Sequence, residues 1–234
     1  MNDRAAVRSG GLAITNPKIM LFALLLVYIL NFLDRQIVNI LAEPIKGELG
    51  LSDTQLGLLA GPAFAVFYAV LGIPIARYAD NAKTNRVWLI SICLAVWSGM
   101  TAICGVAQNF AQLALARIGV GVGEAGCTPA AHSLIADSVP PEKRSSAIAF
   151  FGLGIPIGGL LGLIIGGIVN DQYGWRIALM LVGMPGILLA FLLPLLIRDP
   201  RRCADSAHFN TAESPVKAKL SIKDAVREVF AYKA

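Results

Sequence analysis

The chain reads as a series of long apolar blocks separated by short polar connections. A window of about 20 residues, the length that crosses the hydrocarbon core of a bilayer, finds six such blocks. We predict a spanning helix in each, over Ile19–Leu41, Gln55–Ile75, Val87–Val106, Ala111–Leu134, Ala147–Val169 and Ile177–Ile197. The pattern therefore predicts an all-α membrane protein with six transmembrane helices.

The amino-acid composition supports a membrane protein and argues against a soluble domain, a metalloprotein and an enzyme. Apolar residues make up 56% of the 234-residue chain and charged residues only 15%, and the mean hydropathy is +0.66. A soluble domain of this size carries a more polar surface. The two histidines, His132 and His208, have no metal-ligand spacing, and no Ser/His pair, paired-aspartate arrangement or P-loop occurs. We expect neither a metal site nor an enzyme.

Basic residues concentrate in alternate connections. They precede the first block, lie between the second and third and between the fourth and fifth, and follow the sixth. By the positive-inside rule, both termini are expected in the cytoplasm. We predict a cytosolic tail over residues 1–18, a bundle over 19–197, and a cytosolic linker over 198–234. The linker ends in an amphipathic helix, SIKDAVREVFAYKA, that leads towards something not present in the chain.

The fourth block places two ionisable residues in an apolar helix. Arg117 and Glu124 are seven residues apart, so they project from nearly the same face, about 10 Å apart along the axis. Charged groups at this depth are costly and point to a functional site. The glycines between them, Gly119, Gly121 and Gly123, permit close approach of another helix.

The first block has its own polar group. Asn31 shares a helix face with Asp34 and Arg35. At about 1.5 Å per residue, Asp34 and Arg117 lie at similar depth, so they are candidates for an ion pair if the two helices are neighbours. Alternatively, the helix ends at Asp34, and Arg35 extends to the membrane surface.

The fifth block carries a glycine stripe. Gly158, Gly162 and Gly166 repeat every four residues, which favours a close helix crossing. A packing role and a moving hinge are equally consistent with this pattern.

Several motifs resemble one family. The fourth-helix motif Arg117-x-x-x-Gly121-x-Gly123-Glu124 resembles that of the major facilitator superfamily of secondary transporters. The connection from Ala76 to Arg86 is similar to the family's loop between helices two and three. NFLDRQ, LGIPIARYAD, PPEKRSSA and YGWR, together with the extended fourth-helix segment, resemble the Spinster-like branch over about residues 19 to 200.

The resemblance implies a fold and a set of roles. The family fold has two six-helix bundles, of which this chain supplies the first, and the second is an expected partner missing from it. Asp34 and Glu124 are implied as proton-binding carboxylates. The implied ion-pair or substrate contacts are Arg35, Arg117 and Asn31. The implied cytosolic gating loop comprises Arg77, Asp80, Lys83 and Arg86. A proton gradient, with no cofactor, is implied as the driving force, and a bacterial inner membrane as the location.

The leading hypothesis is the N-terminal half of a proton-coupled transporter. Its implied solute is small and organic, lipid-like or anionic. The alternative is a non-transporting six-helix membrane module, or a half that acts only as a dimer. The sequence leaves the substrate, the direction of transport and the proton stoichiometry open.

Overall fold

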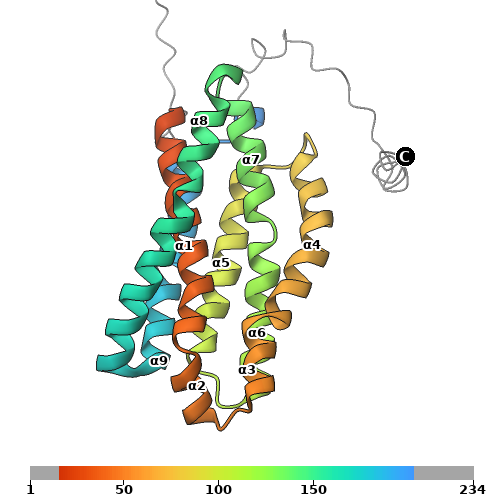
Figure 1. Cartoon of the computed structure of the whole chain (residues 1–234). Coiled ribbons are helices and arrows are strands. Elements are labelled where there is room, and N and C mark those ends of the chain that lie inside the picture. Colours follow the sequence, from red (N-terminus) through yellow and green to blue (C-terminus); the bar gives the residue numbers. More distant parts are fainter. Residues whose placement is uncertain (1–15, 203–234) are drawn as a thin grey trace, which may run out of the picture. The chain divides into compact units, whose positions relative to one another are not determined.

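The computed structural model describes residues 16–202, which consist almost entirely of helix (Figure 1). Most of the predicted tail and linker, including the amphipathic helix, lies outside the described residues. The helices are α1 Pro17–Ile40, α2 Ala42–Leu49, α3 Asp53–Ala60, α4 Pro62–Asp80, α5 Arg86–Cys104, α6 Phe110–Glu124, α7 Cys127–Ser138, α8 Pro141–Gly152 and α9 Gly154–Leu196, followed by the 3-10 helix η1 Pro200–Arg202.

Local signals in the sequence explain where helices begin. The Asn16 side chain accepts a hydrogen bond from the backbone N of Lys18, and Pro17 occupies the first helical position of α1. At the start of α3, the Ser52 hydroxyl accepts from the Gln55 backbone N, and the Gln55 side chain accepts from the Ser52 backbone N. This reciprocal capping box satisfies two amide groups that the helix itself leaves unbonded.

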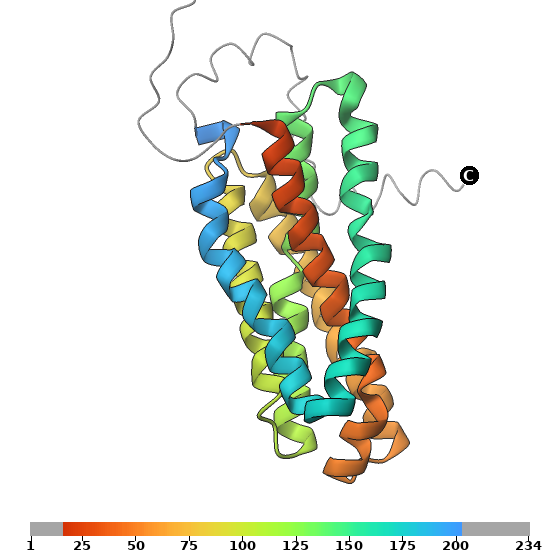
Figure 2. The same ribbon diagram turned by 90° about the vertical axis from the view of Figure 1, so that its left-hand side faces the viewer.

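Length and composition identify four membrane-crossing helical stretches among the described residues: Pro17–Ile40, Asp53–Asp80, Arg86–Cys104 and Pro141–Leu196. The last stretch contains a break at Gly174, whose φ of 81° and ψ of 164° are non-helical. Figure 2 shows that the two halves of α9 run in opposite directions. Glycine suits this position because it adopts positive φ without strain. The predicted fourth block is divided into α6 and α7 around Ala125 and Gly126. The all-α membrane fold is thus confirmed, and the count of six crossings stays a prediction.

The bundle packs around two apolar clusters, one towards each end. We call the end where α8 begins the α8 end and the opposite one, which carries α2, the α2 end (Figure 1). On α1, residues up to Val27 join the cluster at the α8 end, and residues from Leu33 join the other. On α5 the change falls between Trp97 and Cys104. Buried polar residues occupy this transition, and they define the candidate site.

Glycines bring the neighbouring helices close. Added Cβ atoms on Gly158 and Gly162 of α9 would meet the backbone of α1, and one on Gly166 would meet its side chains. A Cβ on Gly121 of α6 would lie 2.7 Å from the backbone O of Phe64 in α4, and one on Gly123 would lie 2.6 Å from the backbone N of Trp97 in α5. Gly119 lies against the Met100 side chain. Each of the six predicted packing glycines therefore faces a neighbouring helix.

Candidate functional site

The site is built first from one face of α1. This helix continues to Ile40, so the alternative in which it ends at Asp34 is wrong. Asn31 and Asp34 are 1% and 2% exposed. The Arg35 side chain is 28% exposed, so its guanidinium retains access that the two neighbouring polar groups lack.

The opposing face comes from α6. Arg117 is 3% exposed and Glu124 is completely buried. Glu124 is the last residue of α6, immediately before the Ala125–Gly126 junction with α7. The charged residue at the end of this helix therefore lies next to a break in regular backbone structure.

One ion pair joins α1 to α6. Arg35 Nε donates to Glu124 Oε2 at 2.7 Å. The same guanidinium lies 5.2 Å from the centre of the Phe32 ring, 5.0 Å from that of Phe64 and 4.7 Å from that of Tyr68. Arg35 is thus held by a carboxylate and by three aromatic rings, two of them on α4.

Asp34 and Arg117 do not form the ion pair that the sequence suggested. No salt bridge within 4.0 Å joins them in the described structure, although their charges are close enough to interact. The Arg117 guanidinium instead lies 5.4 Å from the centre of the Phe64 ring. Successive residues of a helix point about 100° apart, so Arg35, one position beyond Asp34, reaches Glu124 instead.

Unpartnered polar atoms gather around this ion pair. Within residues 16–202, buried atoms without a hydrogen-bond partner include Asn31 Nδ2 and Oδ1, Asp34 Oδ1, Trp97 Nε1, Thr101 Oγ1, Arg117 Nε and Glu124 Oε1. Each such atom costs about 1–3 kcal/mol unless water, a proton or a ligand satisfies it. The cluster is therefore chemically suited to bind a proton or a polar group.

Sequence reasoning missed four contributors to this site. Phe64 and Tyr68 lie four residues apart on α4 and contact Arg35, and Trp97 and Thr101 lie four apart on α5. Such pairs share a helix face, but aromatic residues and single hydroxyls are common in apolar helices. Their role becomes visible only when the neighbouring helices are placed.

A second charged cluster lies at the α8 end. Arg86 is fully buried, and its guanidinium donates to Asp199 Oδ1 and Oδ2, to Asp137 Oδ2 and to the backbone O of Ser133. Arg201 Nε also donates to Asp137 Oδ2, at 2.7 Å. Arg77, Asp80 and Lys83, the other predicted loop residues, are exposed.

The Asp199 carboxyl is strongly held in this cluster. Burial raises its pKa, but the hydrogen bonds and charge of Arg86 outweigh burial, so the pKa is lowered overall. Asp137 and Asp199 were not predicted, because nothing local in the sequence links them to Arg86. The positive charge of a buried arginine is a signal that such partners must exist.

A third cluster closes the α2 end. Arg176 donates to Glu48 Oε1 at 2.8 Å, to Gly105 O at 3.1 Å and to Ala107 O at 2.6 Å. Trp175 Nε1 donates to Glu48 Oε2 at 2.5 Å. The hydrogen bonds from Arg176 and then from Trp175 lower the pKa of Glu48. This cluster ties together α2, the α5–α6 connection and the reversal in α9.

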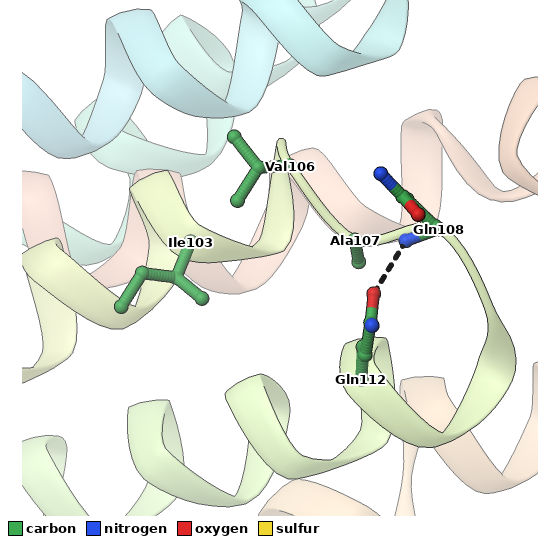
Figure 3. Close-up of a pocket in the computed structure, with 5 residues that line it drawn as sticks. All are labelled: Ile103, Val106, Ala107, Gln108 and Gln112. Carbon is green, nitrogen blue, oxygen red and sulfur yellow. Dashed lines mark hydrogen bonds between the residues drawn. The ribbon is translucent and has the colours of Figure 1, made fainter.

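A pocket of about 330 Å³ also lies at the α2 end, away from the central charges. It is lined by Ile103, Val106, Ala107, Gln108 and Gln112, and Gln108 N donates to Gln112 Oε1 at 2.8 Å (Figure 3). None of these side chains is charged, so the pocket lacks the chemistry of the central site. Across the described part of the chain, no group of three or more His, Cys, Asp or Glu side chains is placed to hold a metal ion.

Fold and site together define a helical membrane protein with buried charges between its helices. The sequence pattern of the Major Facilitator Superfamily matches residues 24–233. The chain therefore belongs to this family.

Individual relatives agree with the Spinster-like resemblance. The chain is 42% identical over 174 residues to an MFS-type efflux pump of Mycolicibacterium smegmatis, covering 74% of this chain and 40% of the relative. It is 33% identical over 206 residues to Protein spinster homolog 1 of Homo sapiens, covering 86% of this chain and 38% of the relative. These relatives are named as a pump and a Spinster protein, in agreement with the prediction that the chain is not an enzyme.

Solved structures support the same fold. A bacterial homolog to the human lysosomal transporter Spinster, in inward-facing and unoccupied conformation, matches with a TM-score of 0.79 and 40% identity. The match covers 92% of this chain and 49% of that one. The regions that match this chain thus cover 38% to 49% of the lengths of these relatives.

Proposed function

We propose that this chain forms the first bundle of a proton-coupled secondary transporter that moves a small organic solute by alternating access. The observation that carries the proposal is the partly buried ion pair between Arg35 of α1, 28% exposed, and Glu124 of α6, which is fully buried. An ion pair inside a helical bundle is weak evidence for stability alone, since apolar residues fill such space as well or better. Its position within apolar helices favours a functional role.

Asp34 and Glu124 are the proposed proton carriers. A proton bound to a Glu124 carboxylate oxygen removes its negative charge and weakens the 2.7 Å bond from Arg35. Arg35 is then available to a solute anion, and its partial exposure provides the access. Loss of the proton restores the pair, so proton binding and solute binding are linked through one guanidinium.

Arg117 and Asn31 complete the proposed solute and proton site. Arg117 is a buried cation without an ion pair in the described structure, so an anionic solute group would compensate its charge. Asn31 offers both an unpartnered donor and an unpartnered acceptor. No cofactor is required, because the proton gradient supplies the free energy.

An organic anion is the substrate class that this chemistry favours. Relatives named as a probable L-galactonate transporter of Escherichia coli and a hexuronate transporter of Bacillus subtilis are 31% and 30% identical to the chain. Both names denote sugar acids, which carry a carboxylate that suits arginine. A lipid-like anion, as the Spinster-like resemblance implies, is the second candidate, and lysophospholipid uptake distinguishes the two.

The proposed setting is a bacterial inner membrane with both termini cytoplasmic. Exposed basic residues at the α8 end support this orientation, namely Lys18, Arg77, Lys83, Lys143, Arg144 and Arg198. The α8 end would then be cytosolic, and Arg77, Asp80, Lys83 and Arg86 would form its gating loop. Domain limits at 1–18, 19–197 and 198–234 belong to the same proposal.

A second six-helix bundle completes the proposed transporter. The coverage of relatives, 38% to 49% of their lengths in the comparisons above, supports this part. The alternative is a module that does not transport, or a bundle that acts only as a dimer. A purified chain that remains monomeric and carries no solute in vesicles supports the inert module.

The test is proton-driven uptake by the complete transporter in proteoliposomes. Asp34→Asn and Glu124→Gln should each abolish uptake driven by a pH gradient, because each removes a proton-binding group. Glu43→Gln is the matched control, since Glu43 is exposed on α2. Normal gradient-driven uptake in both site variants would refute the proposal.

A further inference from the structure

We propose that Thr101 of α5 is a positioning residue for Asp34, acting through a hydrogen bond from its hydroxyl to the carboxylate. The inference rests on the proposed function and extends the site to a third helix. Thr101 is 1% exposed and lies on α5 at the transition between the two apolar clusters, and Asp34 lies next to the same transition on α1. Thr101 Oγ1 and Asp34 Oδ1 are both buried without a partner in the described part of the chain, so each lacks a bond that the other can supply.

One face of α5 is directed at the charged cluster. Trp97, Thr101 and Cys104 follow the i, i+4, i+7 spacing of a helix face, and each is at most 1% exposed. The crossing is close, because a Cβ on Gly123 of α6 would lie 2.6 Å from the Trp97 backbone N. The α5 backbone is therefore fixed against α6, which holds the Thr101 hydroxyl beside the site.

The charged groups around Asp34 do not replace a hydrogen bond from Thr101. Among the described residues, Arg117 and Glu124 of α6 interact with it electrostatically, and the Cys104 thiol of α5 is a further titratable group near it. Arg35, the next residue on α1, is engaged by Glu124, and α9 packs against this part of α1 through glycines. Because none of the basic groups forms a salt bridge with Asp34, a hydroxyl donor has a measurable effect on its protonation.

Rotation of the Thr101 side chain allows a reversible bond. A hydroxyl donates to a carboxylate, and it accepts from the same group once that group is protonated. Donation favours the charged form, so the hydroxyl sets the pH at which Asp34 takes up its proton. The role differs from that of Arg35, which holds the other carboxylate by charge.

The same helix offers a matched control. Ser98 is 2% exposed but faces α9, where Gly183 and Gly186 make room for it. Removing its hydroxyl changes packing on α5 without touching Asp34. Ser98→Ala therefore measures the general effect of losing a buried hydroxyl from this helix.

The experiment records the pH profile of uptake by the complete transporter in proteoliposomes. Thr101→Val should move the half-maximal pH upwards by about one unit, whereas Thr101→Ser and Ser98→Ala should leave it in place. Thr101→Ala serves as a second hydroxyl-free variant if valine impairs folding, which thermal unfolding of the purified protein reports. An unchanged midpoint in the hydroxyl-free variants, or an equal shift in Ser98→Ala, overturns the inference. Asp34→Asn separates the two proposals, since normal proton-driven uptake in that variant refutes the proton role of Asp34 itself.

Discussion

Arg86 and Asp199 are 113 positions apart in the chain and are joined by three hydrogen bonds. Asp199 accepts from the Arg86 backbone N at 2.7 Å, from Nε at 3.0 Å and from Nη2 at 2.5 Å. Both side chains are fully buried. The pair fixes the chain that leaves α9 against the start of α5, and Arg201 extends the attachment to Asp137 on α7.

Removing the Asp199 charge should destabilise the bundle. Asp199→Ala leaves the buried Arg86 guanidinium with Asp137 as its remaining carboxylate, and the expected loss is about 3 kcal/mol in unfolding free energy. Denaturant unfolding of the purified protein in detergent measures it. Asp80→Ala, at an exposed position, should change stability little. Equal losses in the two variants would contradict a specific role for the buried pair.

The same pair should make stability sensitive to acid. The folded-state pKa of the Asp199 carboxyl is below its usual pKa. The contribution of this carboxylate to stability is therefore fully present above the usual pKa and is lost as pH falls through the folded-state pKa. Below about pH 4, wild type should lose more stability than Asp199→Asn, and the two should converge. Thermal unfolding midpoints recorded across that range check this, and parallel curves would count against it.

At the α2 end, Arg176 should matter more than Glu48. Glu48→Gln weakens one half-exposed ion pair and should cost less than about 1 kcal/mol. Arg176→Ala also removes the donor to Gly105 O and Ala107 O, at an expected cost of about 1–3 kcal/mol. Denaturant unfolding of the two single variants ranks them, and the reverse order would show that the carbonyl contacts contribute little.

Much of the fold follows from the sequence, because its signals are local. Apolar block lengths locate the helices, and the Ser52–Gln55 capping box identifies the start of α3. Asp34, Arg35, Arg117 and Glu124 are identifiable as site candidates because charge inside an apolar helix is costly. Their convergence on one region of the bundle needs only that α1 and α6 face each other.

The pairing within the site could not be predicted in the same way. Which arginine reaches Glu124 depends on helix rotation and depth to within a fraction of a turn, and helix ends read from sequence are uncertain by several residues. Tyr68 and Asp199 depend on contacts between segments far apart in the chain. Nothing in their own neighbourhoods distinguishes them from residues with no partner.

Adjacent glycines on α9 provide a direct test of close packing. A Cβ at Gly158 would overlap the backbone O of Ile29 and lie 2.9 Å from Phe32 Cβ, whereas one at Gly159 has nothing within 4 Å. Gly158→Ala should therefore force α1 and α9 apart and cost about 1–3 kcal/mol. Gly159→Ala should be neutral or stabilising by up to about 1 kcal/mol, because alanine favours helix. Unfolding free energies of the two variants decide the matter: if they respond alike, the stripe at Gly158, Gly162 and Gly166 does not set the distance between these helices.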